Sequence, residues 1–414
     1  MESLRFIRAN ARYLSAGVTL MLSTCPGQTF FISIFAAQIM ADFSLSDGEW
    51  GALYTVATTA SAIALFWAGP LTDRFRVRHL AWIIMPGLAL ACILMSRSAS
   101  VTSLVLVIFL LRFFGQGMMF QLAATAMARW FTRRRGLALS ISAMGFAFGQ
   151  AFYPMTFAAL LDRFDWRELW GIAALLVLVA FPVILWLLTL ERTPSAHAEA
   201  SGSAGMDGRH WTRSQVLKSP FFLMLLPMLL GPPAWGTSLF FQQVHIASVK
   251  GWPLAHYLAL IPLMTAISVA VTLISGPFID RFGAGRAMQF FLVPWIAGFV
   301  VLSFTDSLAI AAVAFAAFGV AAGLQATLIT AFWAEFFGTR YIGAIKAGST
   351  SVMVFGSAVG PGISGAFIDF GYDFPSQMIA IAVYFLLAAL LVWVAVEAAM
   401  PRLPRAAQID VKGA

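Results

Sequence analysis

One arginine stands out among the residues whose chemistry could matter. Arg112 lies about ten residues into a long apolar segment, 102–128, which places it roughly 15 Å deep if that segment is a membrane helix. A charge at such a depth costs roughly 2.5–3.5 kcal/mol on insertion scales. The guanidinium must therefore be met by uncharged acceptors, by water or by an anion. Candidate acceptors are Gln28, Tyr54, Gln116 and carbonyl groups freed near Pro26. A structural role, in which Arg112 holds two helices together, is the alternative.

Uncharged polar side chains recur within the other apolar segments, and we expect them to line a central cavity. The full set of candidate binding residues is Gln28, Tyr54, Arg112, Gln116, Tyr153, Gln242, Gln243, His245 and Gln325. Amide side chains also join membrane helices, at about 0.6 kcal/mol each, so each of them has a structural alternative. No Asp or Glu lies within the apolar segments. A coupled proton would therefore need His245, His256, a loop acid or the solute itself as its carrier.

Charged residues at the ends of apolar segments form a third group. Asp73 and Asp280 each follow an apolar segment and face arginine-rich loops. A carboxylate there can pair with an arginine of a nearby loop and approach the positive N-terminus of the next helix. Such pairs would close the cytoplasmic side of a pathway and break when it opens. The candidate gate residues are Gly69, Asp73, Arg74, Arg129, Arg133, Gly276, Asp280, Arg281, Glu335 and Arg340. Charges that only fix the orientation in the membrane are the alternative.

The composition excludes most classes of protein. Of 414 residues, 60% are hydrophobic and only 11% are charged, whereas soluble domains carry about 25% charge. The two cysteines are too few for a disulfide scaffold. The net charge of +8 resides in short clusters between apolar runs, which argues against nucleic-acid binding. No metal-ligand spacing, phosphate-binding loop or nucleophile with a base is present, so the sequence predicts no enzyme, no cofactor and no metal.

The apolar runs predict a polytopic all-α membrane protein with twelve transmembrane helices. Each run reaches or approaches the roughly 20 residues that cross a hydrocarbon core, and continuous runs favour helices over barrel strands. The predicted spans are 14–41, 50–70, 80–96, 102–128, 137–161, 169–190, 220–247, 253–276, 286–304, 308–333, 343–368 and 375–396.

The basic residues predict the orientation. Most of the 26 lysines and arginines fall on one side if the N-terminus is cytoplasmic, which places both termini in the cytoplasm. Arginine outnumbers lysine and no Asn-X-Ser/Thr sequence occurs. Both features fit a bacterial inner membrane.

The chain divides into two similar halves. A segment rich in Ala, Ser, Gly and charge, 192–218, predicts a flexible cytoplasmic linker between six-helix bundles at 1–191 and 219–414. The sequence GPLTDRF at 69–75 recurs as GPFIDRF at 276–282, 207 residues later. The same offset aligns Pro26 with Pro233 and Asp162 with Asp369. Parallel repeats of this kind are typical of transporters with a site between the halves at the bilayer midplane.

These features resemble the major facilitator superfamily of secondary transporters. The loop signature of that family is matched by Gly69, Asp73, Arg74, Arg76 and Arg78, and its helix 4 signature by Arg112, Gly115, Gln116 and Gly117. The resemblance covers residues 12–398 and implies the two six-helix halves, with helices 1, 4, 7 and 10 lining the cavity. Segments 130–150 and 337–365 are similar to the bacterial monocarboxylate and oxalate/formate porter branch. That branch typically has a basic residue in helix 8, where 253–276 has neither Arg nor Lys.

The resemblance implies a monomeric secondary transporter that moves a small organic solute, with a proton or counter-solute as partner. The branch favours an organic anion of the monocarboxylate type. A polyspecific exporter of apolar or aromatic compounds is the alternative, favoured by 38 Phe, 13 Trp and 18 Met. A transporter-like sensor is a third possibility, and the paired gate charges argue against it.

Overall fold

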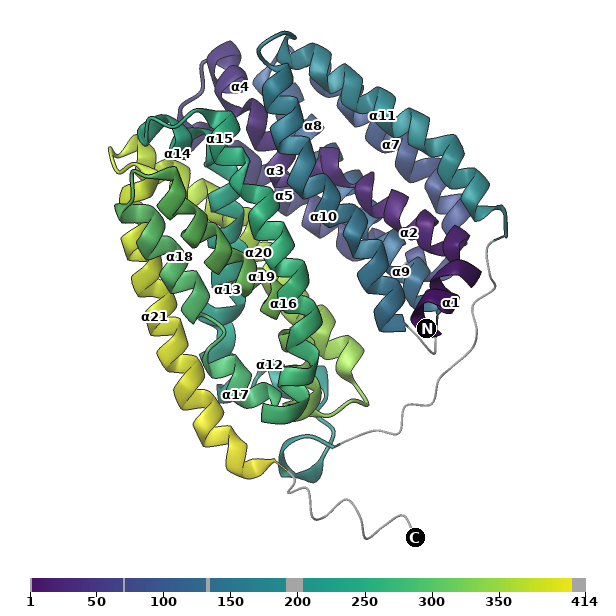
Figure 1. Cartoon of the computed structure of the whole chain (residues 1–414), viewed down its shortest axis with the longest axis vertical. Coiled ribbons are helices and arrows are strands. Elements are labelled where there is room, and N and C mark those ends of the chain that lie inside the picture. Colours follow the sequence, from purple (N-terminus) through teal and green to yellow (C-terminus); the bar gives the residue numbers. More distant parts are fainter. Residues whose placement is uncertain (1, 70, 132–134, 191–203, 404–414) are drawn as a thin grey trace. The chain divides into compact units, whose positions relative to one another are not determined.

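The computed structural model describes residues 2–69, 71–131, 135–190 and 204–403. Within these ranges the chain is almost entirely helical and contains no β-strand (Figure 1). The predicted all-α architecture is therefore confirmed.

Every predicted apolar segment corresponds to a helix or to a group of short helices. The first segment consists of five short elements: α2 (Ala11–Leu22), η1 (Cys25–Gly27), α3 (Thr29–Ile32), η2 (Ser33–Phe35) and α4 (Ala36–Phe43). The second and third are the single helices α5 (Asp47–Ala68) and α7 (Val77–Ser96), and the fourth consists of α8 (Val101–Leu111), η3 (Arg112–Met119) and α9 (Phe120–Trp130). The fifth and sixth are α10 (Arg135–Leu160) and α11 (Trp166–Leu187). The second six are α13 (Pro220–Phe241) with α14 (Gln243–Val249); α15 (Leu254–Leu258) with α16 (Leu260–Phe282); α17 (Ala284–Gln289) with α18 (Val293–Phe304); α19 (Leu308–Phe337); α20 (Ile342–Asp369); and α21 (Phe374–Ala399). Short helices flank them: α1 (Glu2–Ala9), α6 (Leu71–Arg74), η4 (Leu188–Leu190), η5 (Met206–Gly208), α12 (Arg213–Leu217) and η6 (Met400–Arg402).

The length and composition of these helices fit a membrane protein. In the described ranges nine helices are long and apolar enough to cross a membrane, and ten if the bent pair 11–27 and 29–43 counts as one span. Helices α5 and α10, with 22 and 26 residues, also have the length of a span. The count of twelve is consistent with this structure.

The chain forms two compact units. Unit 1 comprises 1–198, 239–259 and 361–371, and unit 2 comprises 199–238, 260–360 and 372–414. This division differs from the predicted halves, because 239–259 and 361–371 contact the first half of the chain. Ser33 binds the carbonyl of Phe240, for example, and Ser46 binds Asp369.

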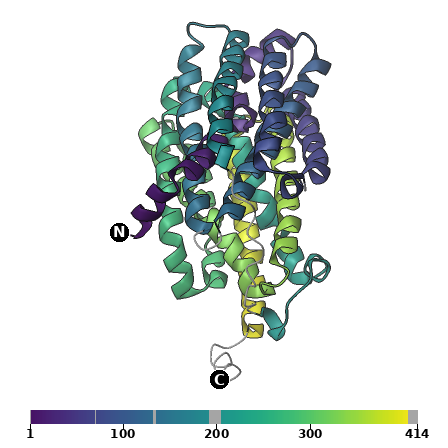
Figure 2. The same cartoon turned by 90° about the vertical axis from the view of Figure 1, so that its right-hand side faces the viewer.

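Small residues bring helices into close contact in both units. In unit 1, α2 packs on α10, where Gly145 and Gly149 face the carbonyl of Val18 and the sulfur of Cys25. In unit 2, α16 packs on α19, and a Cβ atom on Gly319 would lie 2.6 Å from the carbonyl oxygen of Met264. Such close backbone approach increases the van der Waals contact that helps to hold helices together in lipid. Within each unit the long helices run side by side (Figures 1 and 2).

Two membrane helices of unit 1 are irregular near their middle. The first is bent by 50° between Gly27 and Thr29, because Pro26 lies within the short helix η1 and Gln28 is extended. The fourth changes from α-helix to π-helix at η3, which begins at Arg112. π-Helical turns widen a helix locally and are frequent at functional sites.

Part of the predicted flexible linker is folded. Residues 204–218 include η5 and α12, and the backbone N–H of Trp211 donates to the carbonyl of Phe337 at 3.0 Å. Arg402 binds Asp207 through two hydrogen bonds of 3.0 and 2.6 Å, and this arginine lowers the pKa of the Asp207 carboxyl. The polar composition of this stretch gave no sign of its aromatic and ionic contacts, and the linker role of 192–218 stays a prediction. Residues 191–203 lie outside the described residues.

Candidate functional site

The two irregular helices of unit 1 cross at a pair of glycines. A Cβ atom on Gly115 would lie 2.7 Å from the Cα atom of Gly27, and one on Gly27 would meet the carbonyl oxygen of Leu111 closer than 3.0 Å. Only glycine permits this approach at either position. The bend in the first helix and the π-helix in the fourth therefore come into direct contact.

Arg112 connects the two irregularities. Its Nη1 atom donates to the carbonyl oxygen of Gly27 at 3.1 Å and to the Thr29 hydroxyl at 3.2 Å. The break after Gly27 leaves this carbonyl without its helical partner, so the guanidinium satisfies a backbone group that the bend has exposed. The side chain is only 1% exposed, and among the described residues no carboxylate pairs with it.

Aromatic rings form one wall beside Arg112. The guanidinium lies 5.3 Å from the ring centroid of Tyr54, within the range of a cation–π interaction. The Tyr54 hydroxyl lies 2.6 Å from that of Thr29. Phe241 packs against Tyr54 at 4.7 Å and stacks on Trp50 at 5.6 Å between centroids. All these side chains belong to unit 1.

Several buried donors in this region have no hydrogen-bond partner within the described part of the protein. They are Nε and Nη2 of Arg112, Nε2 of Gln28 and Nε1 of Trp50. Unpaired buried donors are uncommon in native proteins, and each costs about 1–3 kcal/mol, with more for a charged group. The region is therefore suited to an electron-rich, hydrogen-bond-accepting group.

The predicted glutamines of the seventh helix form structural contacts. Gln243 Nε2 donates to the carbonyl of Phe30 at 3.1 Å and to the Ser33 hydroxyl at 3.0 Å. Gln242 Nε2 donates to the Ser364 hydroxyl at 3.2 Å. Both glutamines are buried and hold segments of unit 1 together.

Three other candidate binding residues lie apart from these contacts. Tyr153 lines a cavity of about 240 Å³ between α2, η1, α10 and α11, which is mostly apolar and does not include Arg112. Gln116 is half-buried on the π-helix. Gln325 is half-buried on α19 in unit 2.

His245 lies at a contact between helix ends. Its Nδ1 atom is 3.9 Å from Oδ1 of Asp47, and Asp369 lies beside the same helix end, where it accepts a hydrogen bond from Ser46. Asp47 and Asp369 are not among the functional residues predicted from the sequence. The sequence contained only weak indications of them. Asp47 follows a helix-capping serine, and Asp369 is the repeat equivalent of Asp162.

The structure describes only part of the predicted gate. The side chains of Asp73, Arg74, Arg129, Arg133 and Asp280 lie outside the described residues. Glu335 accepts a hydrogen bond of 2.6 Å from the backbone N–H of Ala284. Arg281 and Arg340 lie over the rings of Phe282 and Tyr341, respectively. Gly69 faces the amide of Gln121, and Gly276 faces open space. The gate stays a prediction.

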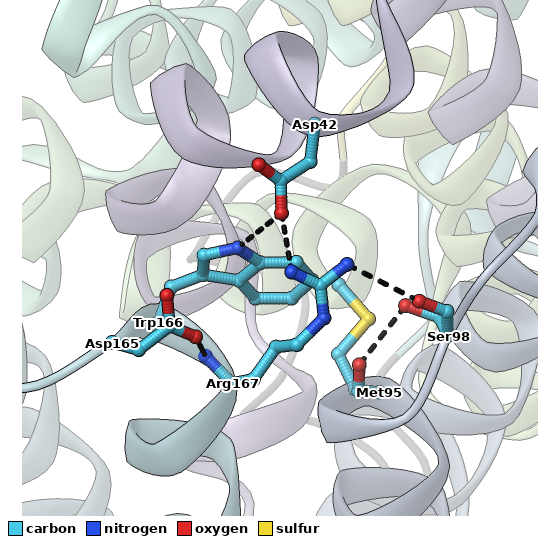
Figure 3. Close-up of polar contacts among 6 residues, drawn as sticks. All are labelled: Asp42, Met95, Ser98, Asp165, Trp166 and Arg167. Carbon is cyan, nitrogen blue, oxygen red and sulfur yellow. Dashed lines mark hydrogen bonds and ion pairs between the residues drawn. The ribbon is translucent and has the colours of Figure 1, made fainter.

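A polar clamp holds the far end of the bent first helix (Figure 3). The carboxylate of Asp42 accepts a hydrogen bond from the indole of Trp166 at 2.9 Å and forms an ion pair with Arg167. Arg167 also donates to the carbonyl of Ser98 at 3.4 Å. The clamp therefore joins α4, α11 and the end of α7, and it fixes the half-helix that carries Thr29 and Ser33.

Comparison with known proteins decides the family. The model of the Major Facilitator Superfamily matches residues 18–347. The chain belongs to the Major Facilitator Superfamily. It is accordingly a multi-pass membrane transporter, as the repeat and the loop motifs predicted.

Named relatives of this transporter are distant. It is 23% identical over 382 residues to a gallate transporter of Pseudomonas putida, a match that covers 83% of this chain and 82% of that protein. It is 26% identical over 194 residues to the MFS transporter asaE of Aspergillus flavus, with 46% of this chain covered. The chain spans only 40% of the length of asaE in that match.

Solved structures share the fold of this transporter. A bacterial homologue of the human lysosomal transporter Spinster, inward-facing and unoccupied, gives a TM-score of 0.66 at 18% identity, covering 96% of this chain and 99% of that one. The nucleoside transporter NupG gives 0.65 at 15% identity, covering 94% and 99%.

Proposed function

We propose that this protein is a secondary active transporter that moves a small organic anion, of the monocarboxylate type, by alternating access. It would act as a monomer in a bacterial inner membrane with both termini cytoplasmic, driven by a proton or counter-solute gradient. The observation that carries the proposal is Arg112. A buried guanidinium that has no carboxylate partner and two unpaired nitrogens within the part of the chain that the structure describes attracts an anion far more strongly than it would in water.

The surroundings of Arg112 favour a carboxylate on a planar or apolar body. Unpaired donors on Gln28 and Trp50 can hydrogen-bond carboxylate or hydroxyl oxygens, while the rings of Tyr54 and Phe241 provide an apolar wall. The similarity to a gallate transporter supports an aromatic acid as the first compound to test. Arg112 itself is buried, so the site must open before a solute reaches it.

Arg112 has two contributions that an experiment must separate. Through Nη1 it stabilises the bend after Gly27, and through Nε and Nη2 it remains available to a ligand. Arg112→Lys keeps the charge but loses the planar fork that holds a carboxylate with two hydrogen bonds. Arg112→Gln loses both. A charge-assisted hydrogen bond contributes about 1.5–3 kcal/mol, or roughly a tenfold to hundredfold change in affinity.

The test is counterflow and binding in proteoliposomes with labelled aromatic acids, aliphatic monocarboxylates, amino acids and dyes. We expect an organic acid to be exchanged, and its Kd to rise severalfold in Arg112→Lys and at least tenfold in Arg112→Gln. The control is Arg97→Gln, which removes an exposed arginine at the end of α7. Lower thermal stability with unchanged affinity in both Arg112 variants would make Arg112 purely structural.

A transporter of apolar compounds has one observation in its favour. The apolar cavity beside Tyr153, with about 240 Å³ of space, could hold an aromatic ring without any charge. Transport of neutral or cationic dyes that is insensitive to the Arg112 variants and reduced by Tyr153→Ala would select this function and overturn the organic-anion proposal.

A further inference from the structure

Three helix ends from the two sequence repeats meet within unit 1. They are the N-terminus of α5 with Asp47, the C-terminus of α20 with Asp369, and α14 with His245. The distribution of arginines predicts that this end of the molecule is extracellular. An alternating-access transporter must separate these ends whenever the outer side opens.

Side-chain contacts join the three ends directly. Nδ1 of His245 lies 3.9 Å from Oδ1 of Asp47. The hydroxyl of Ser46 donates to Oδ2 of Asp369 at 2.7 Å, and the Ser46 Oγ atom accepts a hydrogen bond from the backbone N–H of Glu49 at 3.1 Å. Asp369 is thereby linked to the capping box that begins α5.

The backbones of α5 and α20 also touch. A Cβ atom on Gly51 would lie 2.6 Å from the carbonyl oxygen of Pro361. One on Gly48 would meet the Asp369 carboxylate, and one on Gly365 would meet the carbonyl of Asp47, both closer than 3.0 Å. This close approach leaves the Asp47 side chain 26% exposed, while Asp369 stays exposed at the end of α20.

The charges at this contact are unbalanced when every acid is ionised. Asp47 faces Asp369 from α20 and His245 from α14, and Glu49 lies on its own helix end, bound to the N–H of Ser46. Burial raises the pKa of the Asp47 carboxyl, Asp369 raises it further, and His245 opposes the shift. Two neighbouring carboxylates favour retention of a proton, and a protonated imidazole would neutralise one of them.

We propose that Asp47, His245 and Asp369 form a proton-controlled latch that holds α5, α14 and α20 together when protonated and releases them on deprotonation. The latch rests on the alternating-access function proposed above, and it adds a site where an external proton acts on that cycle. When the ends separate, water surrounds the Asp47 carboxyl and its pKa returns toward the ordinary range near 4.

The sign of the pH dependence follows from this difference. The pKa of Asp47 is higher in the closed contact than in water, so the closed contact binds the proton more tightly than the open one. The extra stability that the bound proton gives the closed contact is fully present below the ordinary carboxyl pKa. It is lost as the pH rises through the raised pKa of Asp47. Acid therefore closes the outer end, and one linked proton changes the closed-to-open ratio by up to about tenfold per pH unit.

The test measures a distance across the latch without any substrate. Spin labels are attached to cysteines replacing Ala41 on α4 and Phe370 after α20, both exposed, with Cys25 and Cys92 changed to alanine. Distances are recorded in lipid nanodiscs between pH 5 and 8. We expect a short distance at pH 5 and at least a threefold loss of that population at pH 8.

Variants identify the groups responsible. Asp47→Asn and Asp369→Asn mimic the protonated acids, so the short distance should persist at pH 8 in each. Because His245 opposes the rise in the pKa of Asp47, His245→Gln should raise that pKa further and move the midpoint to higher pH. The control is Asp162→Asn, the exposed repeat equivalent of Asp369, which should keep the parental profile. Gel filtration and thermal melting establish that each variant is folded.

Two results would overturn the latch: a parental distance that does not change with pH, or an Asp162→Asn variant that loses the response as completely as Asp369→Asn. Neither result depends on the organic-anion proposal, because no organic anion is present when the distances are measured. A flat profile in a protein that still exchanges organic acids refutes the latch alone, and a normal profile without anion transport refutes the substrate proposal alone.

Discussion

Ser33 and Phe240 occupy equivalent positions of the two sequence repeats, 207 residues apart, and they are hydrogen-bonded to each other. The Ser33 hydroxyl donates to the carbonyl oxygen of Phe240 at 2.7 Å and receives the Gln243 amide at 3.0 Å. Equivalent residues can touch only where the two repeats meet. The bent half-helix that carries Ser33 is therefore part of that meeting point.

Loss of the Ser33 hydroxyl should loosen this contact. Ser33→Ala removes the hydrogen bond to the carbonyl of Phe240, and such a bond in a membrane contributes about 0.6 kcal/mol. We therefore expect the ratio of separated to joined segments to rise roughly threefold. The spin-label distance described above would report that shift. Ser357→Ala is the matched control, because the Ser357 hydroxyl donates to the carbonyl of Val354 in its own helix. Equal effects of the two changes would contradict a specific role for Ser33.

The glycine crossing should be intolerant of a methyl group. In Gly115→Ala the new Cβ atom would lie 2.7 Å from the Cα atom of Gly27, so the helices must separate, at a cost of about 1–3 kcal/mol. We expect a lower Tm and weaker ligand binding at Arg112. Gly171→Ala on α11, where a Cβ atom meets nothing within 4 Å, should leave Tm unchanged. A Gly115→Ala protein as stable as the parent would show that the crossing can relax.

The Asp42–Arg167 clamp should contribute more to the position of α4 than to the free energy of unfolding. Both side chains are more than a third exposed, at 39% and 36%, and exposed ion pairs contribute at most about 1 kcal/mol. A double-mutant cycle with Asp42→Asn and Arg167→Gln should give a coupling energy below that value, whereas the transport rate should fall severalfold. Arg163→Gln in the same loop serves as the control. A coupling energy of several kcal/mol would instead make the clamp a main source of stability.

The docked stretch 204–218 should respond to loss of its ion pair. Because Arg402 lowers the pKa of Asp207, the contribution of this carboxylate is present above its ordinary pKa near 4 and is lost as the pH falls through the lowered value. Between pH 5 and 8 the docking should therefore be independent of pH. Asp207→Asn should increase backbone hydrogen exchange in 204–218 severalfold at any pH in this range. Unchanged exchange would assign the docking to Trp211 and Phe337 alone.

The sequence alone determined the class, the repeat and the family of this protein. Runs of apolar residues long enough to cross a bilayer are a local property, and every predicted segment coincides with helices of the structure. The constant offset between GPLTDRF and GPFIDRF likewise needs no coordinates. These features could be predicted because the bilayer imposes helical structure on each segment independently.

The site was decided by tertiary structure. The sequence identified Arg112 as an unpaired charge, but only the crossing with Gly27 gives it a carbonyl acceptor and leaves two of its nitrogens without a partner among the residues that the structure describes. The π-helix of the fourth membrane helix lies where that helix contacts the bent first one, a contact that the sequence did not predict. Asp47, His245 and Asp369 are distant in the chain, and their electrostatic coupling exists only where α5, α14 and α20 meet. Contacts between distant segments decide which buried polar groups have hydrogen-bond partners. Those partners determine which groups can bind a ligand or a proton.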